Sequence, residues 1–194
     1  PWLALADEAR KAGDLSGEVG AMHRAAQAAQ WRSNSGVLLH LLLAAQPPDQ
    51  TPQVRLRSEV RAVVIDSLAS FSSQGSLLGV SRHCSAHQDA NRRQTCAAIA
   101  DRLLGQADSL VLLAVAIGVS ERSGVPAAHV ARAKDEAKRL PTLAVDWEPV
   151  MSASPATACE GMAQVSRYIA SMAALGELGA LRERLAASAP AARR

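Results

Sequence analysis

The sequence predicts an all-α protein with no sheet, from two observations of composition and one of pattern. Of 194 residues, 40 are Ala and 23 are Leu, which are strong helix formers. Only three Trp, one Tyr and one Phe are present, whereas a β-sandwich or barrel needs many aromatic and β-branched side chains. Apolar residues recur at spacings of three and four, the period of a helix. The hydrophobic content of 48% also excludes a disordered chain, and the length fits one ordinary domain or two very small ones.

The first two helices are expected to form a hairpin over residues 2–30. The first helix ends near Gly13 and has apolar residues on one face. These residues are Trp2, Leu5, Ala6 and Ala9. Ser16 is expected to cap the second helix, which Ser33–Gly36 ends. The inner face of that helix is expected to hold Val19, Met22, Ala25, Ala26 and Ala29.

The next segment, Val37–Ala45, is apolar nearly all round, which predicts a central helix. Because His40 lies within it, we expect a hydrogen-bonded core histidine there. Thr51 and Pro52 form a good start for the following helix, since Thr can cap and Pro favours the first helical position. The apolar residues of that helix are Val54, Val60, Val63, Val64 and Leu68. A Ser/Gly loop is expected over residues 70–76.

The remaining helices are predicted from the periodicity of apolar residues and from the Gly, Pro and capping residues between them. They are expected over residues 77–84, 90–104, 110–122, 126–140, 156–175 and 180–187. Asp108 or Ser109 is the expected cap of the third of these, and Gly176–Gly179 separates the last two. Residues 1–188 are therefore expected to form a single helical domain, with 189–194 as a flexible tail.

The first hairpin resembles a tetratricopeptide repeat. Trp2, Leu5, Ala6 and Ala9 match the pattern of its first helix, and Gly13-Asp14 falls at its usual turn. Glu18 departs from the repeat, which has a small residue there, and the closing Pro is absent. Residues 97–116 have a similar paired-helix outline. The resemblance implies stacked antiparallel helix hairpins, as a tetratricopeptide-like α-solenoid or an irregular bundle, and a surface that binds proteins.

Three cysteines bear on the redox compartment. Cys84 and Cys96 lie twelve positions apart, with a plausible turn and helix start at residues 89–91 between them. Two helices that meet there could bring the cysteines within disulfide range. The alternative is a pair of buried free thiols, as in many cytosolic proteins. Cys159 is left over, and is either free or paired with a cysteine outside this chain.

A metal site is the second alternative for the same segment. His83 and His87 are four apart and share a helix face, so with Cys84 and Cys96 they could supply four zinc ligands. Cys84 lies about 100° around the helix from His83, however, and no Cys-x-x-Cys spacing supports the set. The sequence therefore favours a disulfide with surface histidines, and no cofactor or metal is expected.

The irregular segment around Trp147, Pro149 and Met151 is the candidate partner-binding edge. A Trp and a Met in a long loop are typical of a binding surface. The alternative is that Trp147 packs against the end of the bundle. Trp2 and Trp31 are expected to be packing residues at hairpin ends.

Several function classes are disfavoured by composition and motifs. A net charge of +3, without clustered bases and aromatics, does not indicate nucleic-acid binding. The longest apolar runs have nine and ten residues, and a membrane-spanning helix needs roughly 20. No glycine-rich phosphate loop or paired-carboxylate motif occurs, and Cys159-Glu160 lacks a recognisable partner histidine. The chain is therefore not expected to be an enzyme.

The expected function is non-enzymatic protein binding by a monomer or homodimer. The composition is similar to that of Ala/Arg-rich helical proteins of Gram-negative bacteria, which are often exported. We expect a periplasmic or exported adaptor, or an immunity protein that neutralises a partner such as a toxin effector; the runner-up location is the cytoplasm. Because the chain starts at Pro1, we expect a trimmed or processed chain, in which an upstream segment could have carried a signal or lipid anchor. The alternative is a helical zinc protein or enzyme built on His83, Cys84, His87 and Cys96.

Overall fold

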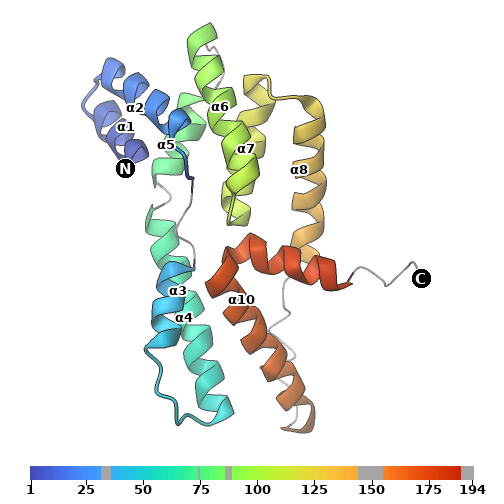
Figure 1. Ribbon diagram of the computed structural model, residues 1–194. Helices are drawn as coiled ribbons and strands as arrows, with labels where there is room; N and C mark the ends of the chain where they lie inside the picture. The colour runs from blue at the N-terminus through green and yellow to red at the C-terminus, as the bar shows by residue number, and fades with distance from the viewer. Residues whose placement is uncertain (32–35, 74, 86–88, 144–154, 189–194) are drawn as a thin grey trace. The chain divides into compact units, whose positions relative to one another are not determined.

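The computed structural model describes residues 1–31, 36–73, 75–85, 89–143 and 155–188. Every regular element in these ranges is a helix, and adjacent helices pack against one another (Figure 1). This confirms the predicted all-α class without a sheet. None of the helices in the described part of the chain has the length and apolarity needed to cross a membrane.

The contacts divide the chain into two compact units, each built from two stretches of sequence. Unit 1 contains residues 1–33 and 71–138, and unit 2 contains residues 34–70 and 139–194. One of the three boundaries, 70/71, falls inside helix α4, which runs from Pro52 to Ser73. The predicted single domain over 1–188 stays a prediction.

Unit 1 is a set of packed hairpins. Its helices are α1 (Trp2–Lys11), α2 (Leu15–Gln27), α5 (Gly75–His83), α6 (Ala90–Gln106), α7 (Leu110–Ser123) and α8 (Ala127–Arg139). Helix α1 packs against α2, and α6 packs against α7 (Figure 1). The first turn contains Gly13 at φ +74°, in the left-handed region that glycine adopts at little cost. Contacts of α2 with α6, and of α5 with α1 and α7, join the two hairpins.

Short polar side chains cap the starts of three helices of unit 1, α2, α6 and α7. The carboxylate of Asp14 accepts a hydrogen bond from the backbone N–H of Gly17 at 2.8 Å, so the expected cap at Ser16 is wrong. Asp89 caps α6 in the same way. Of the two expected caps of α7, Asp108 and Ser109, the structure has Ser109, whose hydroxyl accepts a hydrogen bond from the N–H of Leu112 at 3.2 Å. These side chains satisfy N–H groups that have no partner within the helix.

The core of unit 1 consists mainly of small and aliphatic side chains. Fully buried members include Ala6, Met22, Val80, Ile99, Leu103, Leu113 and Val119. Trp31 is buried, and its indole N–H donates to the carbonyl of Ala25 at 2.9 Å, which agrees with the expected packing role. Leu5 and Val19, both expected on inner faces, are about half exposed. The position on α2 that is buried instead is Glu18.

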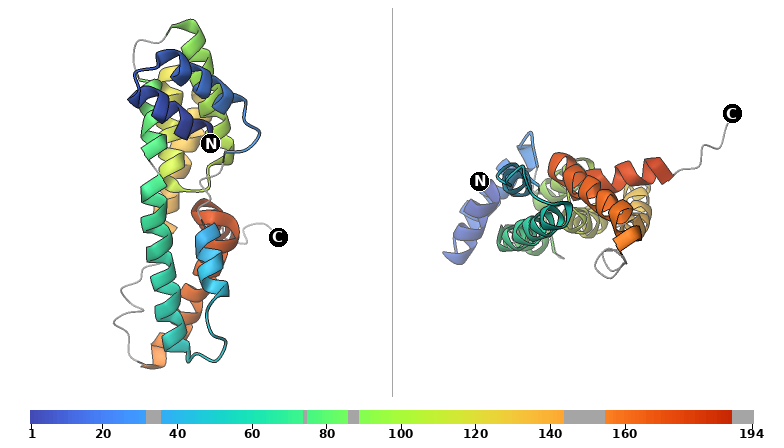
Figure 2. Two further views of the ribbon diagram at one scale, coloured as in Figure 1. Left: turned by 90° about the vertical axis from the view of Figure 1, so that its left-hand side faces the viewer. Right: turned by 90° about the horizontal axis from the view of Figure 1, so that it is seen from below.

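Unit 2 is built around three helices and a short 3₁₀ turn. They are α3 (Val37–Ala44), α4 up to Ser70, η1 (Leu140–Leu143) and α10 (Pro155–Ser188). Helix α3 lies alongside α4 and packs against α10 (Figures 1 and 2). Helix α10 is kinked at Gly176, where φ is +74°, so the predicted interruption is present. The predicted loop over 70–76 is wrong, because α4 continues to Ser73 and α5 begins at Gly75.

Two predictions about α3 are also wrong. Leu39 is the buried residue of this helix, while Val37 and Leu41 are 55% and 60% exposed, so the helix is not central. His40 is exposed, and is not a core histidine. A run of apolar residues shows that a segment is hydrophobic, but it does not show which neighbours cover it. Here only one side of α3 is covered by α4 and α10.

Candidate functional site

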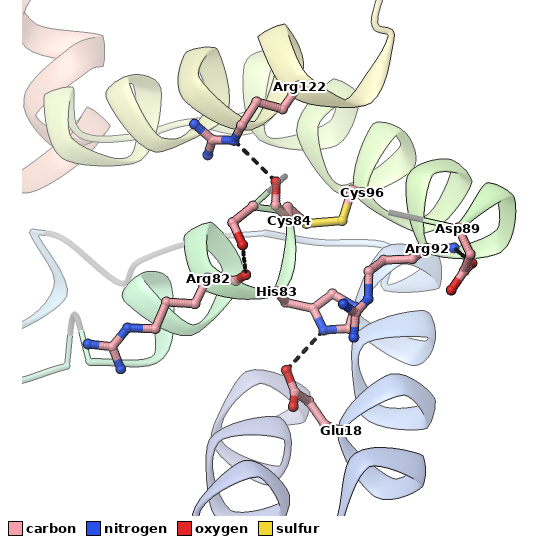
Figure 3. The surroundings of a disulfide bond; sticks show 9 residues. Glu18, Arg82, His83, Cys84, Asp89, Arg92, Cys96 and Arg122 are labelled. Carbon is pink, nitrogen blue, oxygen red and sulfur yellow. Dashed lines mark hydrogen bonds and ion pairs between the residues drawn. A yellow bond between two sulfur atoms is a disulfide. The ribbon is translucent and has the colours of Figure 1, made fainter. Parts of the chain in front are cut away.

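The end of α5 holds the first candidate site, a disulfide between Cys84 and Cys96 (Figure 3). Both cysteines are fully buried, and their Cα atoms are 5.7 Å apart. Cys84 follows the last residue of α5, and Cys96 lies one and a half turns into α6. The predicted disulfide is therefore present, and it joins two helices that the chain connects through a short segment.

A buried polar pair lies beside this disulfide. Nδ1 of His83 is 3.0 Å from Oε1 of Glu18, and both side chains are almost completely buried (Figure 3). Burial is the main cause that lowers the pKa of His83 below 6.5, and the hydrogen bond with Glu18 opposes this shift. In the tautomer that carries its proton on Nδ1, the imidazole donates a hydrogen bond to the carboxylate oxygen of Glu18.

A third contact reaches the same point from α7. Nε of Arg122 donates to the backbone carbonyl of Cys84 at 3.1 Å, which satisfies a carbonyl at the C-terminus of α5 (Figure 3). We name this group the disulfide corner, consisting of Glu18, His83, Cys84, Cys96 and Arg122. It ties the end of α5 to α6 by a disulfide, and to α2 and α7 by one hydrogen bond each. Its arrangement is suited to holding helices together.

The zinc alternative needs the same residues in another state. A zinc-binding cysteine is a thiolate, and in this structure the sulfurs of Cys84 and Cys96 are bonded to each other. Nδ1 of His83 points to Glu18, and His87 lies outside the described residues. Among the residues that are described, no three His, Cys, Asp or Glu side chains gather so that they could hold a metal ion.

The other predicted site residues are not placed by the structure. Trp147, Pro149 and Met151 lie outside the described residues, so the candidate binding edge stays a prediction. The predicted tail, 189–194, also lies outside them. Cys159 is within α10, but its side chain is not described. His129 is exposed on α8, and its Nδ1 lies 3.7 Å from Oδ1 of Asp101.

The second candidate site is the exposed apolar surface of unit 2. Helix α3 exposes Val37 and Leu41, and helix α4 exposes further large aliphatic side chains. Those on α4 are Val54, Val64, Ile65 and Leu68, each at least 41% exposed. Single exposed apolar residues are common on proteins, but several on two neighbouring helices are typical of a binding surface.

Sequence reasoning missed this surface and the Glu18–His83 pair. The signal for the pair was present, because Glu18 is the position at which the hairpin departs from the tetratricopeptide pattern. A carboxylate on the inner face of a helix needs a buried partner, and His83 is that partner. The signal for the surface was that α3 has more apolar residues than can be buried on one face of a helix.

The resemblance to a tetratricopeptide repeat is supported only at the level of architecture. Helices α1 and α2 form the expected hairpin, and α6 and α7 form the second one. Comparisons with protein-family models, curated proteins and solved structures found no match to this chain. The packing of adjacent hairpins is compatible with a helical repeat, and membership of a repeat family stays a prediction.

Proposed function

We propose that this chain is a non-enzymatic protein-binding protein that acts in an oxidising compartment. In its most specific form, it is an exported bacterial adaptor, or an immunity protein that binds and neutralises a partner such as a toxin effector. The observation that carries the proposal is helix α3, an almost entirely apolar helix whose Val37 and Leu41 are more than half exposed.

The energetic argument is that a partner would remove these side chains from water. Burying a Leu or Val side chain contributes about 1.5–3 kcal/mol. A few such side chains together can supply much of the free energy of a specific complex, since the strongest contacts of an interface are few and central. Helix α3 is positioned for this role because its covered side is held in place by α4 and α10.

The compartment is inferred from the Cys84–Cys96 disulfide. Disulfides form and persist in secreted and periplasmic proteins, and are rare in a reducing cytosol. The Cys84–Cys96 disulfide is buried within unit 1 and joins the end of α5 to α6, which is typical of a structural disulfide. This supports an exported protein, with the periplasm of a Gram-negative bacterium as the proposed location.

The test uses purified, oxidised chain and a panel of purified secreted proteins encoded beside its gene. Binding is measured by surface plasmon resonance for the wild type and for Leu41→Asp. We expect one panel member to bind, and the variant to lose roughly tenfold to a hundredfold in affinity, because Leu41 can no longer be buried favourably.

The matched control is Leu15→Asp, which changes an exposed Leu of unit 1 in the same way. Leu15 is 69% exposed at the first position of α2, where an acidic residue is compatible with the helix dipole. This variant should keep the affinity of the wild type. If no panel member binds, or if Leu41→Asp binds as the wild type does, the proposal is wrong.

A further inference from the structure

Helix α4 separates its charges by sign within unit 2. Its two acidic residues face inward, where each has a partner. Glu59 accepts hydrogen bonds from Arg55, at 3.0 Å, and from the hydroxyl of Ser166 on α10. Asp66 accepts a hydrogen bond from the backbone N–H of Leu39, near the start of α3, at 3.1 Å. Both carboxylates are therefore used inside the unit, and none remains to balance arginines on the outer side of α4.

The outer side of α4 carries arginines and aliphatic residues at alternating spacings of three and four. This spacing places them in one stripe along the helix. We name it the α4 stripe, consisting of Val54, Arg57, Arg61, Val64 and Leu68, with Ile65 beside it. The aliphatic members are 41–63% exposed, and both arginines are exposed. Among the described residues, no carboxylate pairs with Arg57 or Arg61.

We propose that the α4 stripe docks an amphipathic helix of a partner protein that presents acidic side chains opposite Arg57 and Arg61. This inference rests on the proposed function and adds the class of partner to it. Side chains at alternating spacings of three and four form a ridge along one face of a helix, against which a second helix can pack. The two arginines then select the partner, because an acidic residue opposite each of them would give a charge-assisted hydrogen bond.

A second copy of this chain does not fit the stripe. In a symmetric pair the same surface meets itself, so Arg57 and Arg61 of one copy would approach those of the other. Like charges facing each other in an interface oppose association. Charge complementarity therefore favours a different, acidic chain.

A membrane surface fits the stripe less well than a protein. A helix that lies in a membrane has its apolar residues on one face and its charges at the edges or opposite side. Here Arg57 and Arg61 lie between Val54 and Val64, in the middle of the apolar residues. Insertion would bring two charges into lipid, whereas a protein can offer a carboxylate to each.

The test uses a synthetic helical probe of about three heptads. The acidic peptide has Leu at the positions facing Val54, Val64 and Leu68, and Glu at the two positions facing the arginines. It is made in both sequence orders, so that parallel and antiparallel docking are covered. A basic peptide with Lys in place of both Glu is the control, and binding is measured by fluorescence anisotropy on the full oxidised chain.

We expect the wild type to bind the acidic peptide at least about tenfold more tightly than the basic one. The double variant Arg57→Glu/Arg61→Glu should reverse this preference. The matched control is Arg132→Glu/Arg167→Glu, which makes the same change in net charge at exposed arginines outside the stripe. This control should keep the preference for the acidic peptide.

Several outcomes would overturn the inference. It is wrong if neither peptide binds, or if both peptides bind equally. It is also wrong if the control variant changes the preference in the same way as Arg57→Glu/Arg61→Glu, which we call the stripe variant. If sedimentation velocity shows that the wild type self-associates and the stripe variant does not, the stripe binds a second copy of this chain. Vesicles of phosphatidylserine and phosphatidylcholine would assign it to a lipid surface if they bind the wild type and not the stripe variant, while the peptides do not bind.

The inference and the proposed function can fail separately. The peptide assay depends on α4 and needs no natural partner, whereas the assay on Leu41 depends on α3 and on the panel of secreted proteins. If peptide binding fails while Leu41→Asp weakens a panel complex, protein binding stands without the α4 stripe. If the peptides bind as expected and the panel does not, the stripe stands and the proposed choice of partner is wrong.

Discussion

Burial of the His83 side chain, beside Glu18, links the folding of unit 1 to pH. The pKa of His83 is lowered in the folded state, mainly by burial, while the unfolded chain has the ordinary value of 6.5. Below about pH 6.5 the unfolded chain therefore binds a proton that the folded chain does not. Stability is full above that pH and decreases as the pH falls toward the pKa of the folded state.

The first prediction is that His83→Gln reduces this pH dependence. Gln can still donate a hydrogen bond to Glu18, but it does not titrate. Urea midpoints at pH 7, 6 and 5 should fall for the wild type by more than for the variant. The exposed histidines, such as His40 and His129, stay the same in both chains and serve as the internal control. Equal falls in the two chains would show that His83 does not titrate with folding.

Single residues were predictable where their partners are near in sequence. The cap at Ser109 and the pairing of Cys84 with Cys96 were predicted from local spacing, over three and twelve positions. Glu18 and His83 are separated by 65 positions, and Asp66 meets the start of α3 across 27. No local pattern specifies such contacts, since they depend on how whole helices pack.

At the scale of elements, the helices were predicted better than their ends and their surroundings. The positions of Gly and Pro predicted most of the ends of helices, and they also predicted the kink at Gly176. The loop predicted over 70–76 was wrong, because Ser and Gly lower helix propensity by only about 0.5–1 kcal/mol each, which the rest of a helix can outweigh. The placement of α3 was wrong for another reason: its apolarity indicates a preference for burial, which a partner can satisfy as well as a core.

The second prediction concerns Gly36, which precedes α3 and lies against α10. Its φ is +89°, and a Cβ there would lie 2.7 Å from the carbonyl oxygen of Met172 and 3.3 Å from that of Ala173. Gly36→Ala would combine backbone strain with a clash against main-chain atoms that cannot move aside easily. We expect a loss of about 2 kcal/mol or more in the free energy of unfolding, measured by urea denaturation.

Gly105→Ala is the matched control for that change. Gly105 lies within α6 without a positive φ, and a Cβ there would meet no atom within 4 Å. The substitution should leave stability unchanged or raise it by up to about 1 kcal/mol, because Ala is the better helix former. If both variants lose stability equally, close approach at Gly36 is not the cause.

At the scale of the whole molecule, composition was sufficient for the all-α class and insufficient for the division into two units. The 40 Ala and few aromatics predict helices wherever the chain is regular. Each unit, however, joins two distant stretches of sequence, residues 1–33 with 71–138 and 34–70 with 139–194. No linker composition marks two of its three boundaries, since 70/71 falls inside α4 and 138/139 inside α8. The third, 33/34, falls in the Ser/Gly segment 33–36, which was interpreted from the sequence only as the end of a helix.

The third prediction is that removal of the disulfide destabilises unit 1 and changes unit 2 least. Cys84 and Cys96 close a loop of twelve positions, which contributes about 3 kcal/mol in the chain-entropy model. The variant Cys84→Ser/Cys96→Ser should lose stability of that order. The loss should appear in hydrogen exchange as faster exchange in α5 and α6, and in α2, which is held through Glu18.

The same experiment tests the independence of unit 2. Each contact of the disulfide corner joins residues of unit 1, so exchange in α3 and in residues 161–188 of α10 should change least. The wild type treated with reductant is the control, and its exchange pattern should match that of the double variant. Intact mass before reduction should show one disulfide, mapped to Cys84 and Cys96. Faster exchange spread evenly over both units would show that the chain unfolds as one cooperative body, and would favour the single domain expected from the sequence.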